Sequence, residues 1–353
     1  MKSLCFRVVT GFCLLSAINS RVDATVIGHK RLRFIFVFAE LDRERCPTVL
    51  FESRSRYVDA MMPCTSSVET GVQAEHWLNG GMFELTPHGP DTFVGTGPRY
   101  PWGGLYGGQI VAQALRAATL TAESEFRPHS IRAYFIRPGD HNEPIRYEVD
   151  RIRNGRSFLT RRVVARQAIG AILNAECSFQ RSHAATDLQT VEMPQVLGPE
   201  SLEESSFTRR FDRCFVPDEA VDGAARTGAG RVCAWIKVND YDLVNSVSSD
   251  AELMHQCWLA YTSDDLATDT VRAAAIEGTG VEREHWKGVS LDHTIWFHRP
   301  MRSDVWHLHD FTCHHFTASR GLAVGHVFTQ EGEHVATVAQ EVLLRDTRSK
   351  PSS

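Results

Sequence analysis

Two stretches of the chain repeat apolar side chains every three to four residues, which is the spacing of one helix face. The first, Gly107–Ala118, opens with two glycines and places Ile110, Ala114 and Leu115 on one side. The second follows Asp250, a residue type that often caps the start of a helix. Its apolar positions are Leu253, Met254, Cys257, Trp258 and Tyr261. The pattern predicts two buried helices, and we interpret the second as the counterpart of the first.

Each predicted helix is followed by four runs that are typical of β-strands, with turn signals such as Asn154-Gly155 and Glu331-Gly332 between them. The runs after the first helix are 130–136, 145–151, 157–166 and 171–180, and those after the second are 294–298, 306–315, 321–329 and 334–344. One helix followed by several antiparallel strands predicts an α+β fold in which each sheet wraps its own helix.

The plan occurs twice because the sequence repeats itself. The string Phe-Ile-Arg-Pro at 135–138 returns as Phe-His-Arg-Pro at 297–300. A second correspondence, between 156–159 and 320–323, has nearly the same offset along the chain. From this repeat we predict an N-terminal extension over 1–74, a first repeat over 75–183, a linker over 184–206, a second repeat over 207–346 and a tail over 347–353.

Composition narrows the class of protein. The chain has 353 residues, 42% of them hydrophobic, and a formal net charge of −5. It can therefore bury a sizeable core, and the acidic balance argues against non-specific nucleic-acid binding. No run of apolar residues is long enough to predict a membrane span. We expect a cytoplasmic protein, with secretion as an alternative because the short apolar stretch 8–18 resembles part of a signal peptide. A peroxisomal location is a second alternative, although the final residues, 350–353, do not form a peroxisomal address of the Ser-Lys-Leu type.

Metal and thiol chemistry are weakly indicated. The nine cysteines include no Cys-x-x-Cys pair, so neither a disulfide scaffold nor a zinc ribbon is predicted. The most metal-like segment contains His307, His309 and Cys313-His314-His315, and strand alternation would place the first two on one face. A sheet surface explains the same pattern, and no acidic residue stands at a His-Glu-x-x-His spacing. We expect no metal and no cofactor.

At several motifs the sequence resembles the acyl-CoA thioesterase II family, over roughly 75–346. In the first repeat the matching strings include Tyr-Gly-Gly-Gln at 106–109, Tyr-Phe-x-Arg-Pro-Gly-Asp at 134–140 and Arg-Asn-Gly-Arg-Ser-Phe at 153–158. In the second they include Leu-Ala-Tyr-Thr-Ser-Asp at 259–264, Leu-Asp-His-x-x-Trp-Phe-His-Arg-Pro at 291–300 and Gln-Glu at 340–341. The resemblance implies a double hot-dog fold, hydrolysis of fatty acyl-CoA, no cofactor and a homo-oligomer.

The resemblance also implies a catalytic trio. The family attributes thioester hydrolysis to an Asp, a Thr or Ser and a Gln, and these roles fall here on Asp264, Ser290 and Gln340. An acid can activate water, while a hydroxyl and an amide can hold the water or the oxyanion. Asp265 directly follows Asp264, so the sequence leaves open which carboxylate faces the site. A backbone N–H near Gly107-Gly108 is a candidate to polarise the carbonyl.

Other readings remain open at this point. Asp292-His293 could serve an enoyl-CoA hydratase or dehydratase, and a non-catalytic acyl-CoA-binding module would keep the same fold. His255 on the second helix is a further acid-base candidate, although a core histidine is the commoner case. Five arginines are candidates to bind the phosphates of coenzyme A. They are Arg137, Arg153, Arg156, Arg299 and Arg320.

Overall fold

The computed structural model describes residues 81–222, 229–239 and 249–348, so the predicted extension over 1–74 lies outside the described residues. Its helices are α2 (Gly107–Thr119), α4 (Ser249–Thr262) and α5 (Ala267–Thr279). The strands of the first repeat are β1 (Thr86–Pro87), β2 (Thr92–Gly95), β3 (Phe126–Phe135), β4 (Ile145–Asn154), β5 (Phe158–Gln167) and β6 (Gly170–Arg181). The later strands are β7 (Gln195–Val196), β8 (Phe211–Val216), β9 (Val221–Asp222), β10 (Ala229–Val238), β11 (Trp286–Ser290), β12 (Asp292–Phe297), β13 (His307–Thr317), β14 (Arg320–Thr329) and β15 (His334–Asp346).

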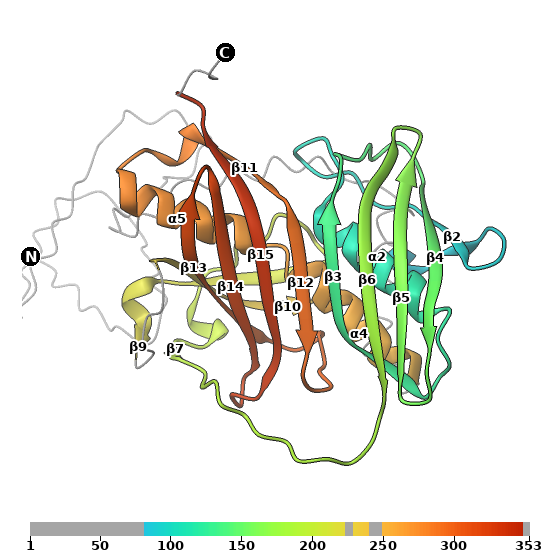
Figure 1. Ribbon diagram of the computed structural model, residues 1–353. Helices are drawn as coiled ribbons and strands as arrows, with labels where there is room; N and C mark the ends of the chain where they lie inside the picture. Colours follow the sequence, from blue (N-terminus) through green and yellow to red (C-terminus); the bar gives the residue numbers. More distant parts are fainter. Residues whose placement is uncertain (1–80, 223–228, 240–248, 349–353) are drawn as a thin grey trace, which may run out of the picture. The chain divides into compact units, whose positions relative to one another are not determined.

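The eight predicted strands are confirmed as β3 to β6 and β12 to β15, with ends that differ by a few residues. They form one antiparallel sheet together with β1, β2, β8 and β10, while β11 pairs with β15 (Figure 1). The strand order β2-β4-β5-β6-β3 of the first half is mirrored by β10-β13-β14-β15-β12 in the second. The two halves join where β3 pairs with β12, and Arg132 stands opposite Thr294 in that pairing.

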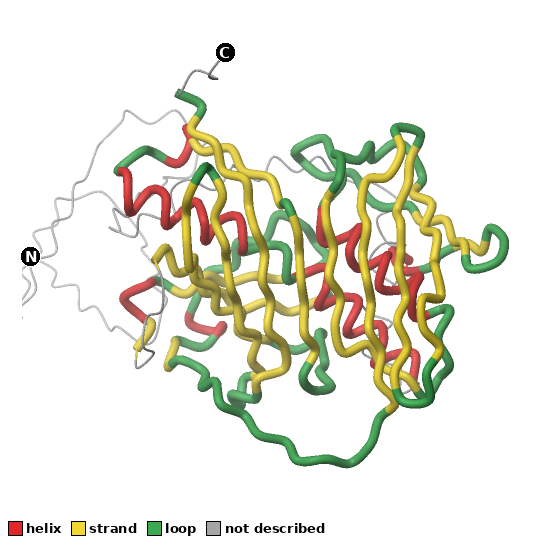
Figure 2. The backbone as a smooth tube through the Cα atoms, in the orientation of Figure 1, coloured by secondary structure: helices red, strands yellow, loops and turns green. Residues whose placement is uncertain are grey.

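The two sheet halves are not covered by the two helices that we predicted. Helix α2 packs against the strands of the first half and α5 against those of the second, whereas α4 packs against α2. The tube in Figure 2 shows these helical segments behind the yellow strands of the sheet. The interval from the start of α2 at Gly107 to the start of α5 at Ala267 is close to the offset of the sequence repeat. The counterpart of α2 is therefore α5, and our assignment of that role to the helix after Asp250 was wrong.

Small residues allow α5 to lie close to its sheet. A Cβ atom on Gly321 in β14 would lie 2.3 Å from Val271 Cγ1 of α5. Gly230 in β10 has φ +59°, and a Cβ there would lie 2.1 Å from the backbone nitrogen of Ala274. Side chains cannot be accommodated at such distances, so glycine is required at both contacts. The described region has no helix long and apolar enough to cross a bilayer.

Candidate active site

Asp264 occupies the short connection between α4 and α5, where it meets the N-terminus of α2. Its carboxylate accepts a hydrogen bond from the backbone N–H of Gly108, in the first turn of α2. The residue is 8% exposed. A Cβ atom on Gly107 would lie 2.6 Å from Asp264 Oδ2, so a side chain at that position would displace the carboxylate. An acid of the second repeat thus caps a helix of the first, where the helix dipole favours negative charge.

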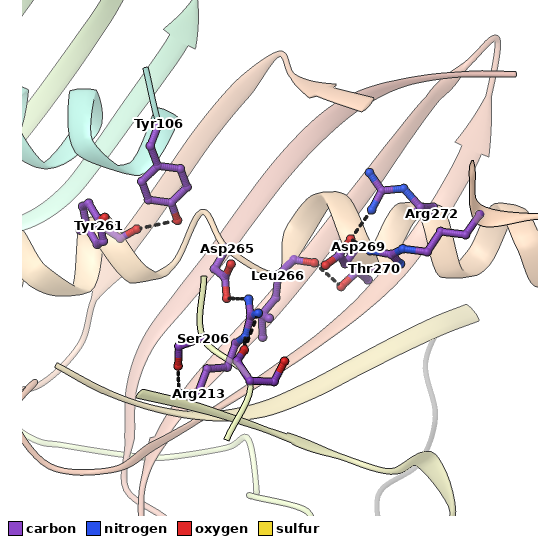
Figure 3. A network of polar contacts seen from close by, with 11 residues as sticks. Tyr106, Ser206, Arg213, Tyr261, Asp265, Leu266, Asp269, Thr270 and Arg272 are labelled. Carbon is purple, nitrogen blue, oxygen red and sulfur yellow. Dashed lines mark hydrogen bonds and ion pairs between the residues drawn. The ribbon is translucent and has the colours of Figure 1, made fainter. Parts of the chain in front are cut away.

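The start of α2 is held to the end of α4 by a second contact. The hydroxyl of Tyr106 donates to the backbone oxygen of Tyr261 at 2.9 Å, as Figure 3 shows. A Cβ on Gly108 would lie 2.2 Å from that same oxygen. The glycine pair therefore has a definite use, which is to let the α2 backbone approach α4 and Asp264. We predicted that a backbone N–H near Gly107-Gly108, or at the equivalent place of the second repeat, polarises the substrate carbonyl. The N–H of Gly108 is bonded to Asp264.

Ser290 and Gln340 lie beside Asp264. Ser290, at the end of β11, donates its hydroxyl hydrogen to Asp264 Oδ1 at 3.3 Å. Gln340, on β15, donates from Nε2 to Ser290 Oγ at 2.7 Å. Gln340 is fully buried and Ser290 is half-buried. The structure therefore brings the three predicted residues together in one hydrogen-bonded group.

Two further residues, His293 and Ser263, extend this hydrogen-bonded group. Of the two, only His293 was a candidate from the sequence. His293 on β12 meets Gln340, with 2.5 Å between Nδ1 and Oε1. The hydroxyl of Ser263 lies 2.9 Å from His293 Nε2. Both side chains are fully buried. Ser263 was missed because it is far from His293 in the sequence, and only its position next to Asp264 gave any signal.

The environment of Asp264 raises its pKa to about 7. Removal of the carboxylate from water is the largest cause, because burial disfavours the charged form. Hydrogen bonds from Gln340, Gly108 and Ser290 act in the opposite direction, and the neighbouring charge of Asp265 adds a small further increase. A carboxylate with a pKa near neutrality can both accept and return a proton at physiological pH.

Asp265 points away from this group. Its carboxylate lies 2.5 Å from Arg213 Nη1 on β8, and the two side chains are 5% and 4% exposed. The Arg213 guanidinium also donates to the backbone oxygen of Ser205 and lies 4.5 Å from the centre of the Phe215 ring. Figure 3 shows Asp265 and Arg213 pointing toward each other. Of the two adjacent acids, Asp264 contacts Ser290, while Asp265 forms a buried ion pair.

The alternative acid-base pair does not form. Asp292 accepts a hydrogen bond from the backbone N–H of Glu341 at 2.6 Å, while the His293 ring contacts Gln340 and Ser263. His255 bonds Ser303 at 3.0 Å and has no described contact with the trio. The acid near His255 is Asp304, at 3.9 Å, and no described hydrogen bond links this pair to the trio.

The other predicted candidates lie apart from the trio. His307 contacts the backbone oxygen of Val305, and the described residues contain no cluster of three or more metal-ligating side chains. Among the arginines, Arg137 donates to a backbone oxygen, Arg299 pairs with Asp187 and Arg320 pairs with Glu341. Arg153 and Arg156 are exposed. The assignment of any of them to the phosphates of coenzyme A stays a prediction.

Comparison with known proteins identifies the family of the chain. Residues 96–180 match the family model described as the acyl-CoA thioesterase N-terminal domain, and residues 186–344 match the one described as the acyl-CoA thioesterase C-terminal domain. These two ranges contain α2, most strands of both halves and all three residues of the trio.

Individual relatives agree with the family models. The chain is 32% identical to acyl-CoA thioesterase 2 of Haemophilus influenzae, over 68% of this chain and 87% of that protein. It is 31% identical to human acyl-coenzyme A thioesterase 8, over 75% of this chain and 88% of that protein. A solved acyl-CoA thioesterase II from Mycobacterium marinum aligns with a TM-score of 0.65 at 31% identity, covering 77% of this chain and 98% of that one. A hot-dog protein from Alicyclobacillus acidocaldarius, at 16% identity and a TM-score of 0.55, shares the fold. The chain belongs to the acyl-CoA thioesterase II family.

Proposed function

We propose that this chain hydrolyses fatty acyl-CoA to a free fatty acid and coenzyme A, using a water molecule activated by Asp264. Family membership supports the reaction class, which is thioester hydrolysis of acyl-CoA. The observation that carries the assignment of residues is the hydrogen-bonded group of Asp264, Ser290 and Gln340 at the N-terminus of α2. The homo-oligomer and the cytoplasmic location expected from the sequence stay predictions.

The proposed reaction proceeds in two steps. Asp264 removes a proton from water as the water oxygen attacks the thioester carbonyl carbon, and a tetrahedral intermediate forms. The amide of Gln340 and the hydroxyl of Ser290 hold the water in line with the carbonyl. The carbon–sulfur bond then breaks, the sulfur leaves with the electron pair, and the proton on Asp264 passes to it. The products are the carboxylic acid and the free thiol, and the carboxylate of Asp264 is regenerated.

Hydrolysis in ¹⁸O-labelled water tests this proposal. Purified protein and palmitoyl-CoA are expected to release free thiol and to place one ¹⁸O atom in the carboxyl group of palmitate. Thiol release is followed with a thiol-reactive dye, and the label is followed by mass spectrometry. Loss of the double bond of an enoyl-CoA without thiol release would identify a hydratase instead. Saturable acyl-CoA binding without any turnover would identify a binding module.

The raised pKa of Asp264 predicts an acidic limb in the pH–rate profile. Only the carboxylate can accept the proton of water, so kcat/KM is expected to fall as the pH drops through about 7. Ser290→Ala removes one of the donors that favour the carboxylate, and the limb is expected to move to higher pH in this variant. Initial rates from pH 5.5 to 9 measure both effects. A profile without an inflection near neutrality would contradict the assignment of Asp264 as the base.

A further inference from the structure

When Asp264 is ionised, the hydrogen bonds around Gln340 have one consistent direction, because the carboxylate can only accept from Ser290 and Ser290 must then accept from Gln340. Its Nε2 donates to Ser290, so Oε1 is the atom that faces His293. An amide oxygen can only accept, and the proton of the 2.5 Å contact must therefore reside on His293 Nδ1. Burial lowers the pKa of His293 to about 4, so the ring is neutral at physiological pH and its Nε2 carries a lone pair. The hydroxyl of Ser263 lies 2.9 Å from that nitrogen and 3.4 Å from the backbone oxygen of Ala260, and its single hydrogen can be donated to the nearer acceptor, His293 Nε2.

These contacts make a single chain of donors and acceptors. It runs from the Ser263 hydroxyl through the His293 ring and the Gln340 amide to the Ser290 hydroxyl, and it ends on the carboxylate of Asp264. Reversal of any one link would leave two donors or two lone pairs facing each other inside the protein, at a high cost in free energy. The tautomer of His293 therefore determines which way the Gln340 amide is turned.

The equivalent strand pairing in the first half of the protein contains no histidine. Arg132 and Thr294 face each other across β3 and β12 and are equivalent positions of the two halves, so the residues that precede them, Ile131 and His293, are also equivalent. Ile131 pairs with Cys177 on β6, at the place where His293 meets Gln340 on β15. Both Ile131 and Cys177 are fully buried. An apolar pair thus fills the equivalent position in the same sheet, and among the described residues the polar pair stands beside Asp264.

We propose that His293 is a positioning residue, which, with Ser263 as its partner, fixes the Gln340 amide so that Nε2 faces Ser290 and Asp264. This inference rests on the function proposed above. His293 touches neither water nor substrate in this mechanism. It acts by keeping an N–H donor, and not a carbonyl oxygen, directed at the trio, because an amide turned over would place a lone pair against the Ser290 oxygen and the Asp264 carboxylate.

Two substitutions of His293 separate this role from simple packing. In His293→Asn the side-chain amide nitrogen can occupy the place of Nδ1 and still donate to Gln340, whereas in His293→Gln the amide reaches the place of Nε2 and the donor to Gln340 is lost. We expect His293→Gln to lower kcat roughly tenfold or more, which is the effect of losing about one hydrogen bond in the transition state, with little change in KM. His293→Asn should keep most of kcat, although it fills less of the buried space.

The pH–rate profile gives a readout that packing alone would not move. The Gln340 donor lowers the pKa of Asp264, so loss of that donor should shift the acidic limb to higher pH. The shift is expected in His293→Gln and not in His293→Asn. Ser263→Ala should act in the same direction as His293→Gln but less strongly, because the Nδ1 tautomer loses the hydrogen bond accepted at Nε2 and only Gln340 still favours it. The control is His255→Gln, since His255 is 3% exposed, has a pKa lowered to about 4 and bonds Ser303 rather than the trio.

The possible results distinguish failure of the positioning role of His293 from failure of the proposed thioesterase function. Equal kcat values and an unshifted limb in both His293 variants would overturn the positioning role, while an inactive Asp264→Asn enzyme would leave the function intact. If the His293 variants fail to fold, as judged by circular dichroism, Ser263→Ala decides, and full activity with an unshifted limb would overturn the role. Absence of thiol release by the wild-type protein would instead refute the proposed function.

Discussion

Replacement of Asp264 by Asn is expected to lower kcat by roughly 10²–10⁴-fold, which is the usual contribution of a general base. The amide keeps the size of the side chain and can accept the hydrogen bond from Gly108, but it cannot take a proton from water. The protein itself should not be weakened. Because burial raises the pKa of Asp264, the ionised carboxylate is a cost to the folded state above its normal pKa, and the neutral amide removes that cost.

Thiol release from palmitoyl-CoA at pH 8 measures kcat of the variant. Urea unfolding of the same samples measures its stability. The matched control is Asp292→Asn, which changes an acid that bonds the backbone of Glu341 and has no place in the proposed mechanism. It should retain most of its activity. An Asp264→Asn enzyme with wild-type kcat would remove Asp264 from the mechanism and reopen the question of which carboxylate acts.

The substitution of the neighbouring acid, Asp265→Asn, is expected to lower the stability of the protein much more than its kcat. It removes the negative charge of Asp265 from the ion pair with the Arg213 guanidinium, whose side chain is 4% exposed. Breaking a buried ion pair from one side typically costs about 3–5 kcal/mol, because the remaining charge stays desolvated. We therefore expect a large decrease in the free energy of unfolding. At temperatures where the variant is folded, kcat should change far less than in Asp264→Asn.

Urea unfolding monitored by circular dichroism tests the stability effect. Asp187→Asn is the matched control, because Asp187 forms a similar pair with Arg299 but its side chain is 66% exposed, and exposed ion pairs contribute little. The double variant Asp265→Asn with Arg213→Met adds a second check. Removal of both charges should recover part of the lost stability, since no unpaired charge then remains buried. Similar unfolding curves for Asp265→Asn and Asp187→Asn would show that burial of the Arg213 pair is unimportant.

The strands and their duplication were predictable because their signals are local. Alternating apolar residues and turn dipeptides locate β3 to β6 and β12 to β15, and the repeated strings relate the two sets. The continuous sheet was not predicted, because nothing in the sequence marks β3 and β12 as partners. Their pairing joins strands of different repeats that lie far apart in the sequence. Strands β8 and β10 were also missed.

Helix α5 was missed for a physical reason. Its buried face consists mainly of small residues, among them Ala267, Ala273 and Ala275, which give a weak apolar pattern. The residues of α4 are bulkier and include Trp258 and Tyr261. Their stronger apolar pattern led us to predict α4 as the counterpart of α2. Small side chains are used in α5 because glycines of β10 and β14 bring the sheet close to the helix. The helix with the stronger apolar pattern, α4, is therefore not the one that packs against the strands of the second half.

The trio residues could be named only through the family resemblance, since a single Asp, Ser or Gln carries little information by itself. The resemblance assigned the acid role to Asp264, but the residues themselves carried no independent signal against Asp265. The distinction depends on Arg213, whose guanidinium binds Asp265 from a strand much earlier in the chain. The part played by Gly107 and Gly108 likewise depends on a distant contact, the approach of α2 to Asp264.

The difference between the His293–Gln340 pair and the Ile131–Cys177 pair has a consequence for stoichiometry. A chain built from two similar halves could carry two reaction centres, yet in the region that the structure describes the polar group exists in one half only. Titration with a non-hydrolysable thioether analogue of acyl-CoA should therefore saturate at one equivalent per polypeptide. The equivalent place in the first half, filled by an apolar pair, keeps the strand pairing without these polar groups, so we expect the duplicated chain to bind one substrate.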